Sequence, residues 1–185
     1  MSTRGRAVSE LAEAACLQVI LRMHDYEYLV SNESFVADIS LFGRHRSSFD
    51  VISYRRTHAL VGMVAIAEDF TIARYLSDHP KVDHKSLSSW TDRRKLWKKY
   101  CGLDIDQWDI ILGFVEVRNA IQHGLGRLTD RQLSPKSRSE TLKFLAAAEI
   151  ERIGDRLVVD DDTVRRCGEV CISFMMALDC AAPKN

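Results

Sequence analysis

The sequence predicts an all-α protein, an up-and-down bundle of about five to six helices with one short β-hairpin before the last helix. Three observations support this fold class. Pro occurs only three times, so long stretches can be helical without interruption. Apolar residues recur every three or four positions within those stretches. Residues that cap helices, such as Ser and Asp, precede several of them.

The composition is that of one globular domain spanning residues 1–185. The chain is 46% hydrophobic and 28% charged, which is ordinary for a soluble protein. Its 26 basic and 26 acidic residues balance, so any contact with nucleic acid must come from a local patch. No apolar run approaches the roughly 18–20 residues of a membrane span, and no signal-peptide pattern opens the chain. We therefore expect a cytoplasmic protein with no membrane contact, whose five cysteines are reduced core residues.

The first part of the chain is expected to form two long helices. The first covers about residues 8–30, with Ser9 as its cap. The polar segment 31–50 is expected to be a loop. The second helix covers residues 51–77 and stops before Pro80, because Pro disfavours helical backbone at the preceding residue.

A short basic helix follows, and it is a candidate nucleic-acid site. Ser89 and Asp92 have capping-box spacing, and Gly102 is expected to end the helix. Basic side chains interleaved with an aromatic ring can bind single-stranded nucleic acid through phosphate contacts and stacking. The alternative is a solvated helix anchored to the core by Leu96 and Trp97. The candidate RNA-binding residues are Arg93, Arg94, Lys95, Trp97, Lys98 and Lys99.

The C-terminal part is expected to contain a loop, a helix, a hairpin and a final helix. Residues 127–133 are expected to be a loop, and a helix should run from Ser134 to about Ile150. Gly154 separates two short β-capable runs, which predicts the hairpin. Asp161 or the residue after it is expected to cap a last helix over 163–181.

Between these parts lies the most hydrophobic stretch, residues 104–126, which is expected to be the central helix. Asp104 is a candidate cap, and Gly124 and Gly126 suit the C-terminal end. At about 100° per residue, most of the circumference is apolar, and Arg118 lies within that apolar arc. A guanidinium there is costly unless it has partners or lines a cleft, which makes it the strongest functional signal in the chain. The residues expected to face solvent are Asp106, Asp109, Gly113, Glu116 and Ala120.

The stretch Arg118-Asn119-Ala-Ile-Gln-His123, followed by Gly, resembles the R-x4–6-H signature of HEPN domains. These are helical bundles found in prokaryotic toxins, phage-defence systems and some eukaryotic RNA-processing proteins. An acidic residue on the preceding long helix, here Glu68, and the hairpin before the last helix are further similarities. Some HEPN toxins carry Tyr two residues after the His as a target for an antitoxin, and Leu125 takes that place here.

The resemblance implies a metal-independent endoribonuclease that needs no cofactor and works as a homodimer, with a cognate antitoxin protein as a further partner. His123 is the candidate acid or base, because imidazole titrates near neutrality. Arg118 offers a bidentate fork to phosphate oxygens, and Asn119 can orient the imidazole or hold such an oxygen. Glu68 is a supporting residue. One copy of the motif gives an incomplete site, because Arg118 and His123 lie about 140° apart around the helix.

Other interpretations stay open at this point. Arg118 can be a buried ion-pair partner of Glu68, and His123 can simply bind terminal carbonyls. A binding module for RNA, nucleotide or protein without turnover fits the same residues, as does a structural adaptor. A second match to the spacing, Arg74 to His79, is taken as coincidental, because Tyr75 replaces the polar residue and Pro80 follows.

Overall fold

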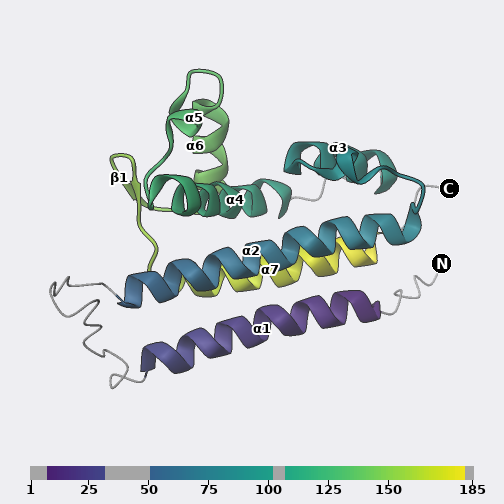
Figure 1. Ribbon diagram of the computed structural model, residues 1–185, viewed down its shortest axis with the longest axis horizontal. Helices are drawn as coiled ribbons and strands as arrows, with labels where there is room; N and C mark the ends of the chain where they lie inside the picture. The colour runs from purple at the N-terminus through teal and green to yellow at the C-terminus, as the bar shows by residue number, and fades with distance from the viewer. Residues whose placement is uncertain (1–7, 32–50, 102–106, 182–185) are drawn as a thin grey trace, which may run out of the picture.

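The computed structural model describes residues 8–31, 51–101 and 107–181, and these form seven α-helices, one 3₁₀ helix and a two-stranded hairpin. This confirms the predicted all-α class. Two long helices, α1 (Glu10–Ser31) and α2 (Val51–Asp78), pack side by side with the last helix, α7 (Asp161–Cys180). On the other side of α2 and α7 lies α4 (Gln107–Gly124), the predicted central helix (Figure 1).

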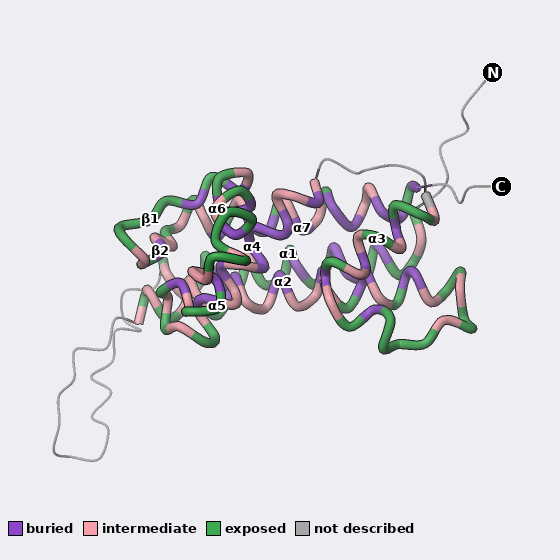
Figure 2. Tube along the Cα trace, turned by 90° about the horizontal axis from the view of Figure 1, so that it is seen from above, coloured by how far each residue is buried: buried purple, intermediate pink, exposed green. Residues whose placement is uncertain are grey.

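The smaller elements gather around α4. A short α6 packs across it, and α3 lies beyond its N-terminal end (Figure 1). The hairpin strands pair antiparallel, with Arg152 opposite Leu157, and the hairpin is largely exposed (Figure 2). The bounds are η2 (His84–Leu87), α3 (Trp90–Cys101), α5 (Asp130–Leu133), α6 (Arg138–Ala147), β1 (Arg152–Ile153) and β2 (Arg156–Leu157).

The core follows the predicted apolar stripes of α2 and α7. Trp108 of α4 and Phe174 of α7 meet edge to face with ring centroids 4.8 Å apart, and Trp90 of α3 packs against both. Burying such a side chain stabilises the fold by about 1.5–3 kcal/mol, and aromatic pairing adds to this. These contacts fix α4 and α3 onto the α2–α7 pair, which is what positions the candidate site.

Three predicted boundaries are wrong. The helix predicted from Ser134 to about Ile150 covers only Arg138–Ala147. Residues 130–133 form the short helix α5 rather than a loop, because Thr129 and Gln132 make a reciprocal capping box. The final helix is capped by Asp160, whose carboxylate accepts from the Thr163 amide at 2.8 Å, so Asp161 is its first residue and not its cap. The Ser89 side chain caps α3 as predicted: Asp92 N–H donates to Ser89 Oγ at 3.1 Å, and the Ser89 hydroxyl donates to Asp92 Oδ2 at 2.6 Å. The predicted cap Asp104 and the segment 32–50 lie outside the described residues.

The predicted solvent face of α4 is also wrong, because α6 covers it. Gly113 and Ala120 are buried, and a Cβ at Gly113 would lie 2.3 Å from the Phe144 carbonyl oxygen. On this face Asp109 pairs with Lys143 of α6 at 2.8 Å, and Glu116 accepts from Gln132 at 2.6 Å. The absence of a side chain at position 113 therefore allows α6 to approach α4 closely.

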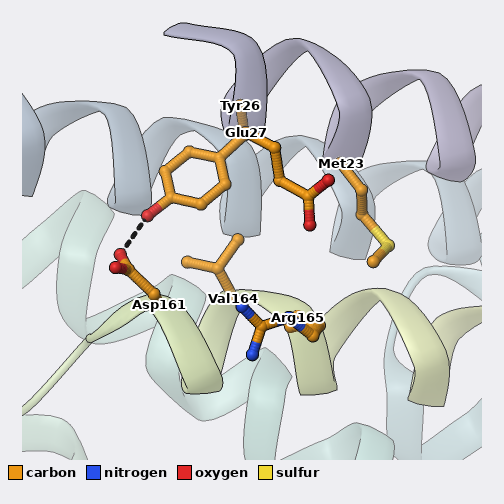
Figure 3. A pocket seen from close by; sticks show the side chains of 6 residues that line it. All are labelled: Met23, Tyr26, Glu27, Asp161, Val164 and Arg165. Atoms are coloured by element: carbon orange, nitrogen blue, oxygen red, sulfur yellow. Dashed lines mark hydrogen bonds between the residues drawn. The ribbon is translucent and has the colours of Figure 1, made fainter. Parts of the chain in front are cut away.

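Polar contacts attach α1 to α7 at both ends. Ser9 donates from its amide and its hydroxyl to Asp179, at 2.8 and 2.6 Å. At the other end, the Tyr26 hydroxyl donates to Asp161 (Figure 3), which also accepts from Arg56 Nε at 2.7 Å. Burial and the bond to Asp161 raise the pKa of Tyr26 to about 12. The phenol therefore stays protonated as a donor throughout the physiological range.

Candidate functional site

The C-terminal end of α4 is a tight turn that leaves His123 exposed. Leu125 and Gly126 have positive φ angles of 51° and 85°, and the Gly126 amide donates to the Ala120 carbonyl at 3.0 Å. Gly tolerates this backbone, whereas Leu125 is strained there, and its side chain is 96% exposed. His123 makes no hydrogen bond or ion pair to the residues that the structure describes, so the predicted contact with terminal carbonyls is not among those present.

Arg118 lies half-buried between α4 and α2, with 17% of its side chain exposed. Its Nη1 donates to Glu68 Oε2, and its Nη2 donates to Asn119 Oδ1 at 3.2 Å. Its Nε is buried and has no hydrogen-bond partner among the described residues. A buried donor without an acceptor costs about 1–3 kcal/mol, and more when it is charged. Glu68 and Asn119 therefore hold this guanidinium in place, but one of its hydrogen-bond donors stays unsatisfied.

Glu68 on α2 receives a second guanidinium besides that of Arg118. Arg93 Nη2 donates to Glu68 Oε1 at 2.7 Å. Burial alone would raise the pKa of Glu68, but the hydrogen bond from Arg93 and the charge of Arg118 outweigh it and lower the pKa. The carboxylate is therefore ionised, and two cations share one anion.

Arg93 is the buried member of this cluster, with only 2% of its side chain exposed. Its Nε donates to the Leu87 carbonyl at 2.6 Å, and its guanidinium carbon lies 4.9 Å from the centre of the Trp90 ring. The capping box at Ser89 fixes the start of α3 and hence the direction of this side chain. Arg93 is one of the predicted RNA-binding residues, but its buried side chain is not available at the surface.

Only part of the predicted basic patch on α3 lies at the surface. Trp97 is 1% exposed and meets Tyr75 edge to face, so it is not available to stack on a base. Arg94 pairs with Asp109 at 2.6 Å. Lys95 is exposed and 3.6 Å from Asp92, and Lys98 and Lys99 are exposed as well. The physical reason is the helical repeat, which turns Trp90, Arg93 and Trp97 toward the core together.

The second Arg/His pair, at the end of α2, is engaged differently. Arg74 is buried and donates to Asp179 at 2.8 Å, to Ser77 at 3.0 Å and to Asp78. The His79 ring packs against Tyr100 and Tyr75, with centroids 4.4 and 4.8 Å apart.

Among the described residues, no group of three or more His, Cys, Asp or Glu side chains is arranged to hold a metal ion. A hollow of about 210 Å³ lies near the hairpin, lined by residues that include Glu149, Asp160 and Arg166. None of the helices in the described ranges has the length and apolar character needed to cross a membrane.

Comparison with protein-family models, with curated proteins and with solved structures found no match.

Proposed function

We propose that this protein is a metal-independent endoribonuclease of the HEPN type. The observation that carries the proposal is the state of Arg118. It is held by Glu68 from the preceding long helix, is partly open to solvent, and has an unsatisfied donor. His123 lies exposed at the end of the same helix. Phosphodiester cleavage without a metal requires a fixed cation and a group that transfers protons, and Arg118 and His123 are the residues proposed for these two roles.

In the proposed reaction the 2′-oxygen of a ribose attacks the adjacent phosphorus. A base takes the proton of the 2′-hydroxyl, the new O–P bond forms, and the bond from phosphorus to the 5′-oxygen breaks. An acid gives a proton to the departing 5′-oxygen, so the products are a 2′,3′-cyclic phosphate and a free 5′-hydroxyl. His123 supplies proton transfer, and Arg118 stabilises the negative charge that builds up on the phosphorane oxygens.

The reaction as proposed needs a second copy of the chain. Arg118 and His123 lie about 140° apart around α4, so they cannot converge on one phosphate within one copy. We propose that two copies meet near the C-terminal ends of their α4 helices. Helix α1, which carries exposed apolar side chains such as Leu17 and Leu21, lies on the opposite side of α2 and α7 from α4 (Figure 1).

Purified protein should cleave RNA in the presence of EDTA and leave cyclic-phosphate ends. Arg118→Ala and His123→Ala should each abolish cleavage. His84→Ala serves as a matched control, because His84 is an exposed histidine in η2 and its loss should leave the rate unchanged. Cleavage that persists in both Arg118→Ala and His123→Ala would show that the site is wrongly assigned. Measuring the molecular mass in solution tests the dimer independently.

The alternative is a binding module of the same fold that holds RNA, nucleotide or a protein without turnover. The ion pair between Arg118 and Glu68 favours it, because this contact orders the guanidinium without a reaction partner. This alternative predicts salt-sensitive RNA binding with no products. Under either function, a role in toxin–antitoxin or phage-defence systems, with an antitoxin protein as partner, is part of the proposal.

A further inference from the structure

The charges around Arg118 do not balance. The guanidinium groups of Arg93 and Arg118 share the single carboxylate of Glu68. Other acids on α3 and α4 have other partners: Asp92 pairs with Lys95, Asp109 pairs with Arg94, and Glu116 accepts from the Gln132 amide. The cluster of Arg93, Glu68 and Arg118 therefore carries one surplus positive charge. Because Arg93 is buried and Arg118 is partly exposed, that surplus is presented to solvent through Arg118.

The contacts of Arg93 determine which oxygen of Glu68 is left for Arg118. Arg93 is fixed by the carbonyls of Leu87 and Ser88 and by the Trp90 ring, and it occupies Oε1 of Glu68. Only Oε2 remains for Arg118. Without Arg93, both carboxylate oxygens would be free to take Arg118 in a bidentate pair, which is the preferred geometry for these groups.

One nitrogen of the Arg118 guanidinium, Nη2, is left for a ligand. Nη1 is committed to Glu68, and Nε is buried without an acceptor among the described residues. Nη2 holds the Asn119 amide oxygen at 3.2 Å, which is longer than the roughly 2.7–2.9 Å of a strong charge-assisted bond. Asn119 is only partly buried, so its amide can move aside and free Nη2 for a phosphate oxygen.

We propose that Arg93 is a positioning residue: by holding one oxygen of Glu68, it leaves Arg118 with surplus positive charge and its Nη2 for a phosphate group. Arg93 does not touch the phosphate. The inference rests on the proposed function only in taking that phosphate to be a phosphodiester of RNA.

The test is the affinity for a short RNA that is 2′-O-methylated at every position, which cannot be cleaved by 2′-hydroxyl attack. Arg93→Gln should weaken binding on the order of tenfold, the size expected for losing one charge several ångströms away at an effective dielectric constant of about 20. Glu68→Gln should strengthen binding by a similar factor, because it removes the neutralising charge. The double variant Glu68→Gln/Arg93→Gln restores the wild-type charge and should bind within about threefold of wild type.

A purely structural role for the cluster predicts a different pattern, in which both single variants weaken binding and the double variant is weaker still. That pattern, or a wild-type protein that does not bind the probe, would overturn the proposal. If Arg93→Gln fails to fold, Glu68→Gln alone decides, since unchanged or weaker binding contradicts the inference. Arg93→Lys keeps the charge and should restore binding to within a few fold of wild type.

The outcome is separate from that of the cleavage assay. The predicted order of affinities without cleavage of ordinary RNA would retain this inference and exclude the nuclease. Cleavage without that order would retain the nuclease and exclude the role of Arg93.

Discussion

The two Arg/His pairs of this chain have the same spacing and similar places in the fold, yet opposite surroundings. Each Arg lies near the C-terminal end of a long helix, with a His five residues later. Arg74 pairs with two carboxylates, those of Asp78 and Asp179. Arg118 shares the one carboxylate of Glu68 with Arg93. One guanidinium is therefore neutralised in the interior, and the other keeps an excess of positive charge at the surface.

The two histidines differ in packing and exposure in the same way as the two arginines. His79 packs against the rings of Tyr75 and Tyr100, whereas His123 is exposed in the last turn of α4. Sequence spacing alone thus carries no information about function in this chain. The number of acceptors around each arginine separates a structural ion pair from a candidate site.

The largest effect is expected from Arg74→Ala, which should lower the free energy of unfolding by about 3–5 kcal/mol. The variant leaves Asp179, whose side chain is buried, without its cation. Urea unfolding at pH 7 measures the loss. Arg165→Ala removes an exposed arginine that also pairs with an aspartate, and should change stability by less than about 1 kcal/mol. A loss of less than about 1 kcal/mol in Arg74→Ala would mean that Arg74 and Arg165 are not structurally distinct.

Arg118→Ala should lower activity strongly and stability only slightly, the reverse of what is expected for Arg74→Ala. Ribonuclease activity should fall by about 10²–10³-fold, the usual cost of removing one group that stabilises transition-state charge. Stability should change by only about 1 kcal/mol, because Glu68 keeps its bond to Arg93. Cleavage rates and urea unfolding on the same preparation separate the two effects. An activity loss that merely follows unfolding would remove the distinction between the pairs.

Replacing each histidine with alanine should have a smaller effect on stability, and this effect should differ between the two pairs. His79→Ala should cost about 0.5–1.5 kcal/mol through lost ring contacts and leave cleavage unchanged. His123→Ala should leave stability within about 0.5 kcal/mol of wild type, as is usual for exposed side chains. Thermal unfolding of the two variants provides the measurement, and equal losses would contradict the difference in packing.

The smallest expected effect is a pH dependence of the stability that the ion pair between Arg74 and Asp179 contributes. Burial alone would raise the pKa of Asp179, but the bonds from Ser9 and Arg74 outweigh it and lower the pKa. A carboxylate with a lowered folded pKa stabilises the protein above its unfolded pKa of about 3.9, and that stability is lost as pH falls through the folded pKa. The difference between wild type and Arg74→Ala should therefore shrink between pH 7 and about pH 3 in urea unfolding. A difference that grows toward low pH would contradict this assignment.

Local patterns predicted most of the elements, while contacts between elements were harder to foresee. The stripes of α2 and α7, the Ser89 capping box and the hairpin follow from spacing and capping chemistry. The burial of Gly113 depends on α6 crossing α4, and no periodicity within α4 contains that information.

For the candidate site, the sequence placed Glu68 beside Arg118 and missed the second partner, Arg93. A signal for it was present, since Arg93 shares a helix face with Trp90 and Trp97. The same spacing predicts that its side chain points toward the core rather than toward RNA.

The bonds between Ser9 and Asp179 connect residues that are 170 positions apart in the chain. During synthesis α1 is made before α7, so the bonds of Ser9 can form only after the end of α7 has been made. The same carboxylate also accepts from Arg74, which until then can pair with Asp78 of its own helix. Synthesis of α7 is therefore the step at which both ends of the three-helix layer can close.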